Sequence, residues 1–128
     1  IGEWAFYWCY ELQSITIPDS VTRIGVQAFH SCGSMTSIVI PVSITVIQKG
    51  TLKSCSHLAS ITLPDTIVFI EEEAFYQCEA LKSVEIPRSV IKIGRRAFNC
   101  KSLKTVSILG GLEYPRSAFH PRARITVY

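Results

Sequence analysis

The chain has 128 residues, a length that fits one domain and allows a buried hydrophobic core. Hydrophobic residues make up 48% and charged residues 18%, with 7 Gly and 6 Pro, which excludes a disordered, collagen-like or low-complexity chain. The net charge of +3 does not by itself indicate a nucleic-acid binder, and no apolar run reaches the roughly 20 residues of a membrane helix. We therefore expect one folded domain, residues 1–128, with no membrane span.

Charge is distributed unevenly along the chain. Residues 1–87 carry four basic and nine acidic side chains, whereas residues 88–128 carry nine basic side chains and one acidic side chain. The C-terminal third is therefore a basic end of the molecule.

A short repeat organises the sequence. Proline recurs at a spacing of 23 at positions 18, 41, 64 and 87. Cysteine recurs in step at positions 9, 32, 55, 78 and 100, and one large apolar position is occupied by Phe6, Phe29, Leu52, Phe75 and Phe98. Such self-similarity is typical of repeat architectures.

Each unit contains the same predicted elements in chain order. Residues 14–17 alternate hydroxyl and apolar side chains, as in a half-buried strand, and Pro18 ends the pairing. Residues 21–25 form a second short extended segment, in which Gly25 and Gly94 predict a corner with positive φ. Residues 26–34 predict a short turn or a single helical turn. Each unit is therefore one coil of a solenoid.

A coil of this size cannot bury its own apolar edge, so the coils must stack with like strands in parallel. We expect five to six coils. Ile1 is in phase with Ile24, which predicts that the chain enters in the middle of a unit and is truncated at its N-terminus. Residues 101–128 are predicted to form a terminal coil, with 125–128 as its last strand.

The motif L-x-x-I-x-I-P-x-x-V-x-x-I-G-x-x-A-F-x-x-C, seen here from Leu12 to Cys32, resembles the BspA-type leucine-rich repeat of bacterial and protozoan surface proteins. This resemblance implies a right-handed leucine-rich-repeat solenoid with parallel strands on its concave face. It also implies a non-catalytic adhesion function at the cell surface or outside the cell. Leu52 at the Phe position, and Gln48 and Glu71 at the Gly position, depart from the pattern without threatening the fold.

Five cysteines raise the question of disulfides or metal. Each lies once per unit in the apolar wall, where a free thiol packs as a small hydrophobic group. In-register side chains do not converge with disulfide geometry, and no paired Cys or Cys/His spacing predicts zinc. His30, His57 and His120 lie in separate coils. We therefore expect buried, reduced cysteines, no metal, no cofactor and no enzyme activity.

Three surfaces are candidates for binding. The first is a hydroxyl-rich sheet formed by the outward positions of the first strand, Ser14, Thr16, Ser37, Val39, Ser60, Thr62, Ser83, Glu85, Thr105 and Ser107. The second is an apolar patch on the second strand, Val46, Val68 and Phe69. The third is an aromatic group in the first unit, Trp4, Tyr7, Trp8 and Tyr10, which serves either as ligand anchors or as cover for the N-terminal end.

Two functions remain open. The first is a protein-binding or adhesion module whose sheet face contacts a host matrix or cell-surface protein. The alternative is a polyanion binder, for acidic glycans or nucleic acid, that uses the basic residues Arg88, Lys92, Arg95, Arg96, Lys101 and Lys104, together with Arg116, Arg122 and Arg124. Only polyanion binding should weaken steeply with salt. End-to-end self-association is a further expectation.

Overall fold

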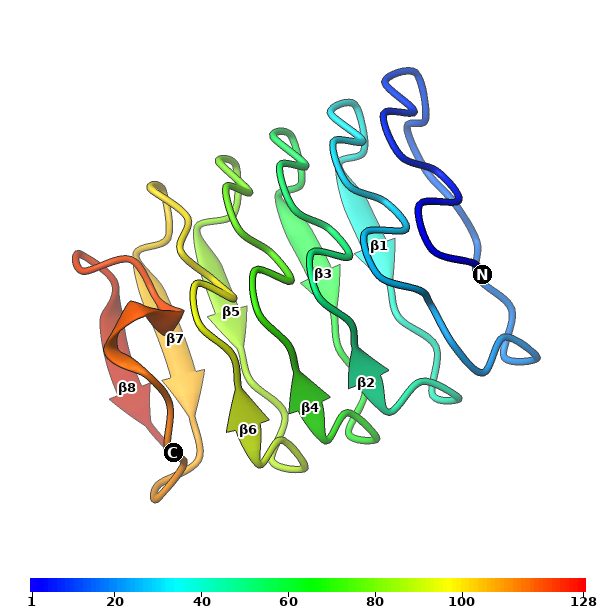
Figure 1. The fold of residues 1–128 in the computed structure, drawn as a ribbon. Helices are drawn as coiled ribbons and strands as arrows, with labels where there is room; N and C mark the ends of the chain where they lie inside the picture. The colour runs from blue at the N-terminus through cyan, green and yellow to red at the C-terminus, as the bar shows by residue number, and fades with distance from the viewer.

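Each repeat of the sequence forms one coil in the computed structural model, which describes residues 1–128 (Figure 1). Strands are short, because each coil turns a corner soon after a strand begins. The elements are β1 (Ser37–Val39), β2 (Val46–Ile47), β3 (Ser60–Thr62), β4 (Phe69–Ile70), β5 (Ser83–Glu85), β6 (Lys92–Ile93), β7 (Thr105–Ile108), the 3-10 helix η1 (Arg116–Ala118) and β8 (Arg124–Val127).

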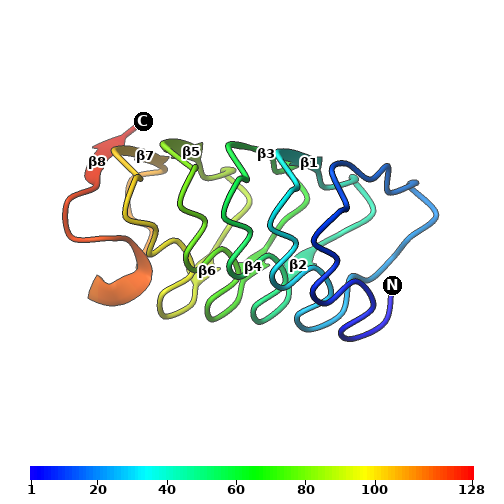
Figure 2. The same cartoon turned by 90° about the horizontal axis from the view of Figure 1, so that it is seen from above.

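The strands form two rows of parallel neighbours. The first-strand row contains β1, β3, β5, β7 and β8, and the second-strand row contains β2, β4 and β6 on the opposite side of the rod (Figure 2). Ser37 pairs with Ser60 and Val46 pairs with Phe69, so the register of both rows equals the period of the sequence repeat. The predicted parallel solenoid is therefore confirmed.

The number of coils is slightly smaller than expected. About four turns repeat regularly, against the predicted five to six. Residues 12–18 of the first unit form no assigned strand. In the last coil the register shortens, since Thr105 pairs with Arg124, and η1 stands where the preceding coil has its outer turn, because Phe98 N–H donates to Ala118 O as Phe75 N–H donates to Ala97 O. Residues 113–114, at the position of the second strand, form no strand. The strand predicted at residues 125–128 is present as β8.

The outer side of each coil consists of consecutive turns. Ala28 N–H donates to Gly25 O and His30 N–H donates to Gln27 O, so of the two predicted alternatives the outer side has short turns and not a helical turn. In each of the first four coils two residues are left-handed, such as Gln27 (φ 53°) and Ser31 (φ 63°) in the second coil, and in the fifth coil only Arg96 is. Left-handed residues reverse the local twist, which explains why no helix propagates here.

The repeated glycine has a different role from the predicted one. Gly25 and Gly94 do not have positive φ, which occurs two residues later in the coil. A Cβ at Gly25 would instead lie 2.6 Å from the backbone nitrogen of Glu3 in the preceding coil, and Gly94 meets the backbone of Glu71 and Glu72 in the same way. Glycine is needed at these two positions because neighbouring coils approach closely there.

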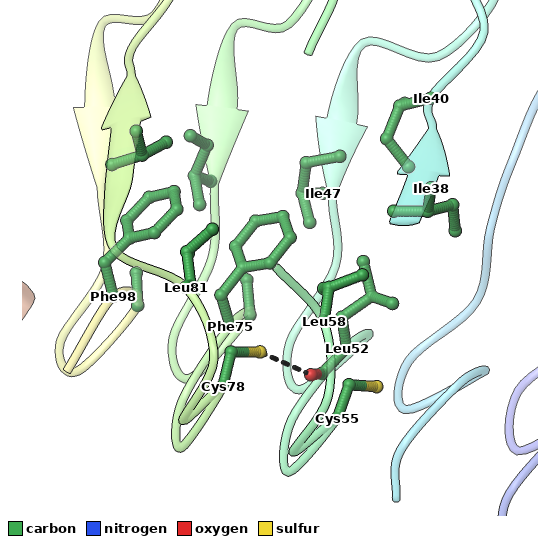
Figure 3. Packing of buried hydrophobic residues seen from close by; sticks show 14 of the residues in the cluster. Ile38, Ile40, Ile47, Leu52, Cys55, Leu58, Phe75, Cys78, Leu81 and Phe98 are labelled. Atoms are coloured by element: carbon green, nitrogen blue, oxygen red, sulfur yellow. Dashed lines mark hydrogen bonds between the residues drawn. The ribbon is translucent and has the colours of Figure 1, made fainter. Parts of the chain in front are cut away.

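The core runs along the whole rod. It comprises 31 buried apolar residues, and equivalent side chains stack on each other from coil to coil (Figure 3). The Phe75 and Phe98 rings stack with centroids 4.8 Å apart, and Phe6 and Phe29 stack at 5.1 Å. Leu52 fills the same wall between Phe29 and Phe75 and is fully buried. Its departure from the aromatic pattern leaves the stacking of coils intact.

The first-strand row is interrupted at two places. β1 pairs with β3, and β5 pairs with β7, but no backbone ladder joins β3 to β5 or joins residues 14–17 to β1. On the outer side the ladder continues throughout: Phe6 N–H donates to Ala28 O, and the same bond recurs in each coil as far as Phe98 N–H to Ala118 O. The coils are therefore joined firmly at their outer turns and less completely along the first-strand row.

Candidate binding surface

The first-strand row presents its outward side chains to solvent, because side chains alternate along a strand. Ser37 and Val39 are exposed, while Ile38 between them is 2% exposed and belongs to the core. The register aligns equivalent positions across coils, so that Ser83 lies beside Thr105 and Glu85 beside Ser107. The exposed members of the row are Ser14, Thr16, Ser37, Val39, Ser60, Thr62, Ser83, Glu85 and Thr105, and Ser107 is half-buried.

Most hydroxyls of this surface are available to a ligand. No side-chain hydrogen bond within the chain uses those of Ser37, Ser60 or Ser83, and the same holds for Ser14, Thr16, Thr62 and Thr105. Only Ser107 is engaged, at 3.2 Å from the Thr126 hydroxyl. A row of unpaired hydroxyls presents donors and acceptors together, and such a surface contacts peptide groups without a charge requirement.

Sequence reasoning missed two residues that extend the row. Arg124 and Thr126 lie on β8 and pair with Thr105 and Ser107. Residues 124–127 alternate polar and apolar side chains, and this alternation could have placed them. With these two residues, the hydroxyl-rich surface also contains one positively charged side chain, Arg124, at its C-terminal end.

The second predicted patch is less exposed than expected. Val46, Val68 and Phe69 are half-buried in the second-strand row. The exposed apolar side chain on this side is Ile91, at 64%.

The aromatic group lies on the outer turns of the first coil, where it forms a chain of contacts. Trp4 and Tyr7 meet edge to face at 4.8 Å, Tyr7 lies 5.6 Å from Trp8, and Trp8 lies 5.3 Å from Tyr10. All four side chains are between 41% and 53% exposed. Tyr7 also contacts His30 of the next coil, with ring centroids 5.1 Å apart. The group therefore covers an outer turn and leaves much of its own surface in solvent.

The basic residues of the alternative hypothesis do not share one face. Arg88 follows β5 at a corner, Lys92 lies in β6, and Arg95 lies in an outer turn. Arg96 belongs to the same outer turn as Arg95, and Lys101 and Lys104 lie between Cys100 and β7.

Some of these basic side chains already have partners within the chain. Arg95 forms an ion pair with Glu72 at 3.0 Å. The guanidinium of Arg88 lies 5.1 Å from the Tyr128 ring, and that of Arg96 lies 5.8 Å from the Tyr76 ring. Three of the six residues are therefore occupied by contacts within the chain.

The repeat cysteines form a ladder inside the outer turns. The thiol of Cys78 donates to Leu52 O at 3.2 Å in the preceding coil (Figure 3), and Cys55 donates to Phe29 O at 3.1 Å. Cys32 and Cys100 make the equivalent bonds. Four of the five thiols are buried, as predicted, and Cys9 is half-buried. Burial raises the pKa of Cys32 to about 11 and that of Cys55 to about 12, so these thiols stay protonated and unreactive near neutral pH.

Groups suited to acid–base or metal chemistry do not converge. No group of three His, Cys, Asp or Glu side chains is arranged to hold a metal ion. His30 Nδ1 lies 2.8 Å from Gln27 Oε1, and partial burial, together with the charge of Lys53, lowers the pKa of this histidine. His57 Nδ1 lies 2.6 Å from Gly33 O in a different coil. The single short 3-10 helix, η1, has three residues, so no helical segment has the length and apolar character that a membrane span requires.

A family model for the BspA-type leucine-rich repeat region matches residues 1–125 with six copies. The chain belongs to this family. It also resembles solved structures of leucine-rich repeat proteins. One of them, from Bacteroides capillosus, is 32% identical, with a TM-score of 0.63, over 70% of this chain and 72% of that one.

Two further structures are similar. A leucine-rich repeat protein from Bacteroides ovatus is 27% identical with a TM-score of 0.62, over 90% of this chain and 33% of that protein. The pneumococcal vaccine antigen PcpA has a TM-score of 0.76 at 20% identity, over 90% of this chain and 30% of the antigen, a likeness of fold alone. This chain thus spans about a third of the length of these two proteins. A search among curated proteins found no match.

Proposed function

We propose that the protein is a non-catalytic binding module of a surface or adhesion protein, and that its first-strand row contacts a protein ligand. The observation that carries the proposal is the row itself, a series of exposed, unpaired hydroxyl side chains held at fixed spacing by the repeat. Repeat solenoids use such extended surfaces for binding. Membership of the BspA-type family, and similarity to a leucine-rich cell surface protein from Faecalibacterium prausnitzii, support the same function and a location outside the cell.

Binding to a panel of purified host extracellular-matrix proteins and to heparin tests the proposal. The measurement is biolayer interferometry at about 0.1 M and about 1 M salt, where the screening length falls from about 10 to about 3 Å. A protein ligand that contacts hydroxyl and apolar groups as well as a few charged ones should lose much less affinity at high salt than a polyanion does. Binding to heparin that disappears at high salt would favour the polyanion alternative.

Paired variants locate the surface. In Ser60→Arg/Ser83→Arg, two bulky charged side chains project from the first-strand row, and binding should fall at least tenfold. The matched control, Thr22→Arg/Thr45→Arg, places the same side chains at exposed positions outside this row. Equal affinity of the two double variants for the ligand would refute a role of the first-strand row.

A further inference from the structure

Two clefts open at the two interruptions of the first-strand row. The first cleft has a volume of about 330 Å³ and is lined by Ile15, Thr16, Ile17, Asp19, Val39 and Pro41. The second cleft has a volume of about 280 Å³ and is lined by Ile61, Thr62, Leu63, Asp65, Glu85 and Pro87. Each residue of the second lining stands 46 positions after its counterpart in the first, which is two coils. The same cleft therefore occurs twice in the molecule.

The recurrence follows a two-coil period in the sequence. Residues 14–19 read Ser-Ile-Thr-Ile-Pro-Asp and residues 60–65 read Ser-Ile-Thr-Leu-Pro-Asp. The coils between and after them carry Val42 and Arg88 at the Asp position, and their strands β1 and β5 pair with the next strand without an opening. The clefts are therefore a repeated feature of alternate coils.

Both clefts combine an apolar floor with an anionic rim. Ile15, Ile61 and Leu63 point inward like core residues, yet they are half-buried, since the neighbouring strand does not close over them. Asp19 and Asp65 are exposed at the rims. Neither takes part in an ion pair, because the two ion pairs of the structure are Lys53–Glu73 and Arg95–Glu72.

This lining fits the side chain of an arginine or lysine. A long aliphatic stem covers the apolar floor while the charged head reaches the carboxylate, and the arginine fork makes two hydrogen bonds to it. Glu85 supplies a second carboxylate in the second cleft, and no basic side chain lines either cleft. One volume lies just above and the other just below the lower limit of the roughly 300–1,000 Å³ range of ligand pockets, which suits one side chain rather than a whole ligand.

The spacing of the clefts restricts the conformation of the partner. β1 and β3 stand between them (Figure 1), and two coils correspond to about 10 Å along the solenoid axis. In a polyproline II segment, residues i and i+3 lie on the same side and about 9 Å apart. Val39, which is 62% exposed, offers an apolar contact to the residues in between.

We propose that the clefts bind an extended protein segment with two basic side chains three residues apart, of the form Arg-x-x-Arg, lying across β1 and β3. This inference rests on the proposed function and specifies the chemistry of its ligand. The two basic side chains enter the two clefts, and the intervening residues pack on Val39. Charge complementarity with the acidic rims selects this partner over an acidic one.

Fluorescence anisotropy with a labelled Arg-Pro-Pro-Arg peptide tests the inference. Asp19→Asn and Asp65→Asn should each weaken binding about fivefold, a value at the upper end for exposed ion pairs. The double variant should weaken it about 25-fold, because distant sites contribute independently. The charge-matched control, Glu3→Gln/Glu11→Gln, removes two exposed carboxylates outside the clefts and should change affinity less than twofold. In the shorter peptide Arg-Pro-Arg the two arginine side chains cannot reach both clefts. Its affinity for the unmodified protein should therefore equal the affinity of Arg-Pro-Pro-Arg for a single Asp variant.

Four outcomes would overturn the inference. Equal loss of affinity in the control and the Asp19/Asp65 double variant would show a general charge effect, and equal affinity for both peptides would show that the clefts do not act together. Dilution-dependent self-association that is abolished by the double variant, without peptide binding, would make a second copy of this chain the occupant. A protein ligand that is sensitive to Ser60→Arg/Ser83→Arg but insensitive to the double variant would refute the cleft proposal and leave the proposed function standing.

Discussion

The outer turns and the first-strand row of this solenoid follow the same repeat but differ in regularity. On the outer side, hydrogen bonds such as Leu52 N–H to Ala74 O join each coil to the next, and the cysteine ladder runs beside them. In the first-strand row the ladder is broken twice, and Ile61 and Leu63 remain half-buried at one break. We infer that the outer turns hold the coils together, while the first-strand row is free to vary in shape and chemistry. Four predictions test this division.

The largest expected effect lies in the aromatic wall behind the outer turns. Phe75→Ala should lower the free energy of unfolding by about 3 to 5 kcal/mol, because Phe75 is fully buried and its stacking partner Phe98 cannot close the cavity without shifting the coils. Thr62→Ala, on the exposed first-strand row, should change it by less than about 0.5 kcal/mol. Urea unfolding measures both. If both variants lost similar amounts of unfolding free energy, the proposed difference between the aromatic wall and the first-strand row would be wrong.

The cysteine ladder should make the outer turns sensitive to alkali. The folded pKa of Cys55 is raised from 9.0 to about 12, so its contribution to stability is complete below pH 9 and is lost as pH rises toward 12. Within that window each such thiol should reduce the free energy of unfolding by about 1.4 kcal/mol per pH unit. Urea unfolding in reductant between pH 8 and 11 gives the slope. Cys55→Ala should reduce this slope by the contribution of one thiol, about 1.4 kcal/mol per pH unit. An unchanged slope would contradict burial of the Cys55 thiol.

Substitution of the repeated glycine, where neighbouring coils approach closely, should lower the stability by an intermediate amount. A Cβ at Gly94 would lie 2.7 Å from the carbonyl carbon of Glu71, so Gly94→Ala should destabilise by about 1 to 3 kcal/mol through backbone displacement. At Gly33 the nearest atom is the Ser56 hydroxyl oxygen at 3.5 Å, an ordinary contact. Gly33→Ala should therefore be tolerated within about 1 kcal/mol. Thermal unfolding of both variants measures the difference, and a reversed order would show that this corner is not close-packed.

The smallest effect should be a gain in stability at a left-handed turn residue. Ser31 has φ 63°, a conformation that costs a non-glycine residue about 1 to 2 kcal/mol. Ser31→Gly relieves this strain and loses about 0.5 to 1 kcal/mol through greater freedom of the unfolded chain, for a net gain of roughly 0.5 kcal/mol in urea unfolding. Ser34→Gly, at a position outside the left-handed set, should only lose stability. Destabilisation by both variants would contradict the strain argument.

Much of the fold could be predicted from the sequence, because the repeat aligns chemically equivalent residues. The spacing of proline, cysteine and phenylalanine predicts one coil per repeat, parallel stacking and a continuous apolar wall, and the pairing of Ser37 with Ser60 confirms the register. The outward set of the first-strand row follows from simple alternation, and its members are exposed apart from the half-buried Ser107. These features depend on local periodicity, which a single sequence contains.

Other features depend on how neighbouring coils meet, and only the tertiary structure decided them. Position 25 requires glycine because the backbone of Glu3 in the preceding coil leaves no room for a Cβ atom. The left-handed conformation that the sequence predicts at Gly25 is found instead at Gln27 and Ser31. The contacts that occupy Arg88 and Arg96 likewise join different coils. The sequence by itself determined the coil and its inside and outside, because these follow from the order of side chains within one unit. The interruptions of the first-strand row, and the clefts they open, depend on the spacing between coils, which is set by packing across the whole stack.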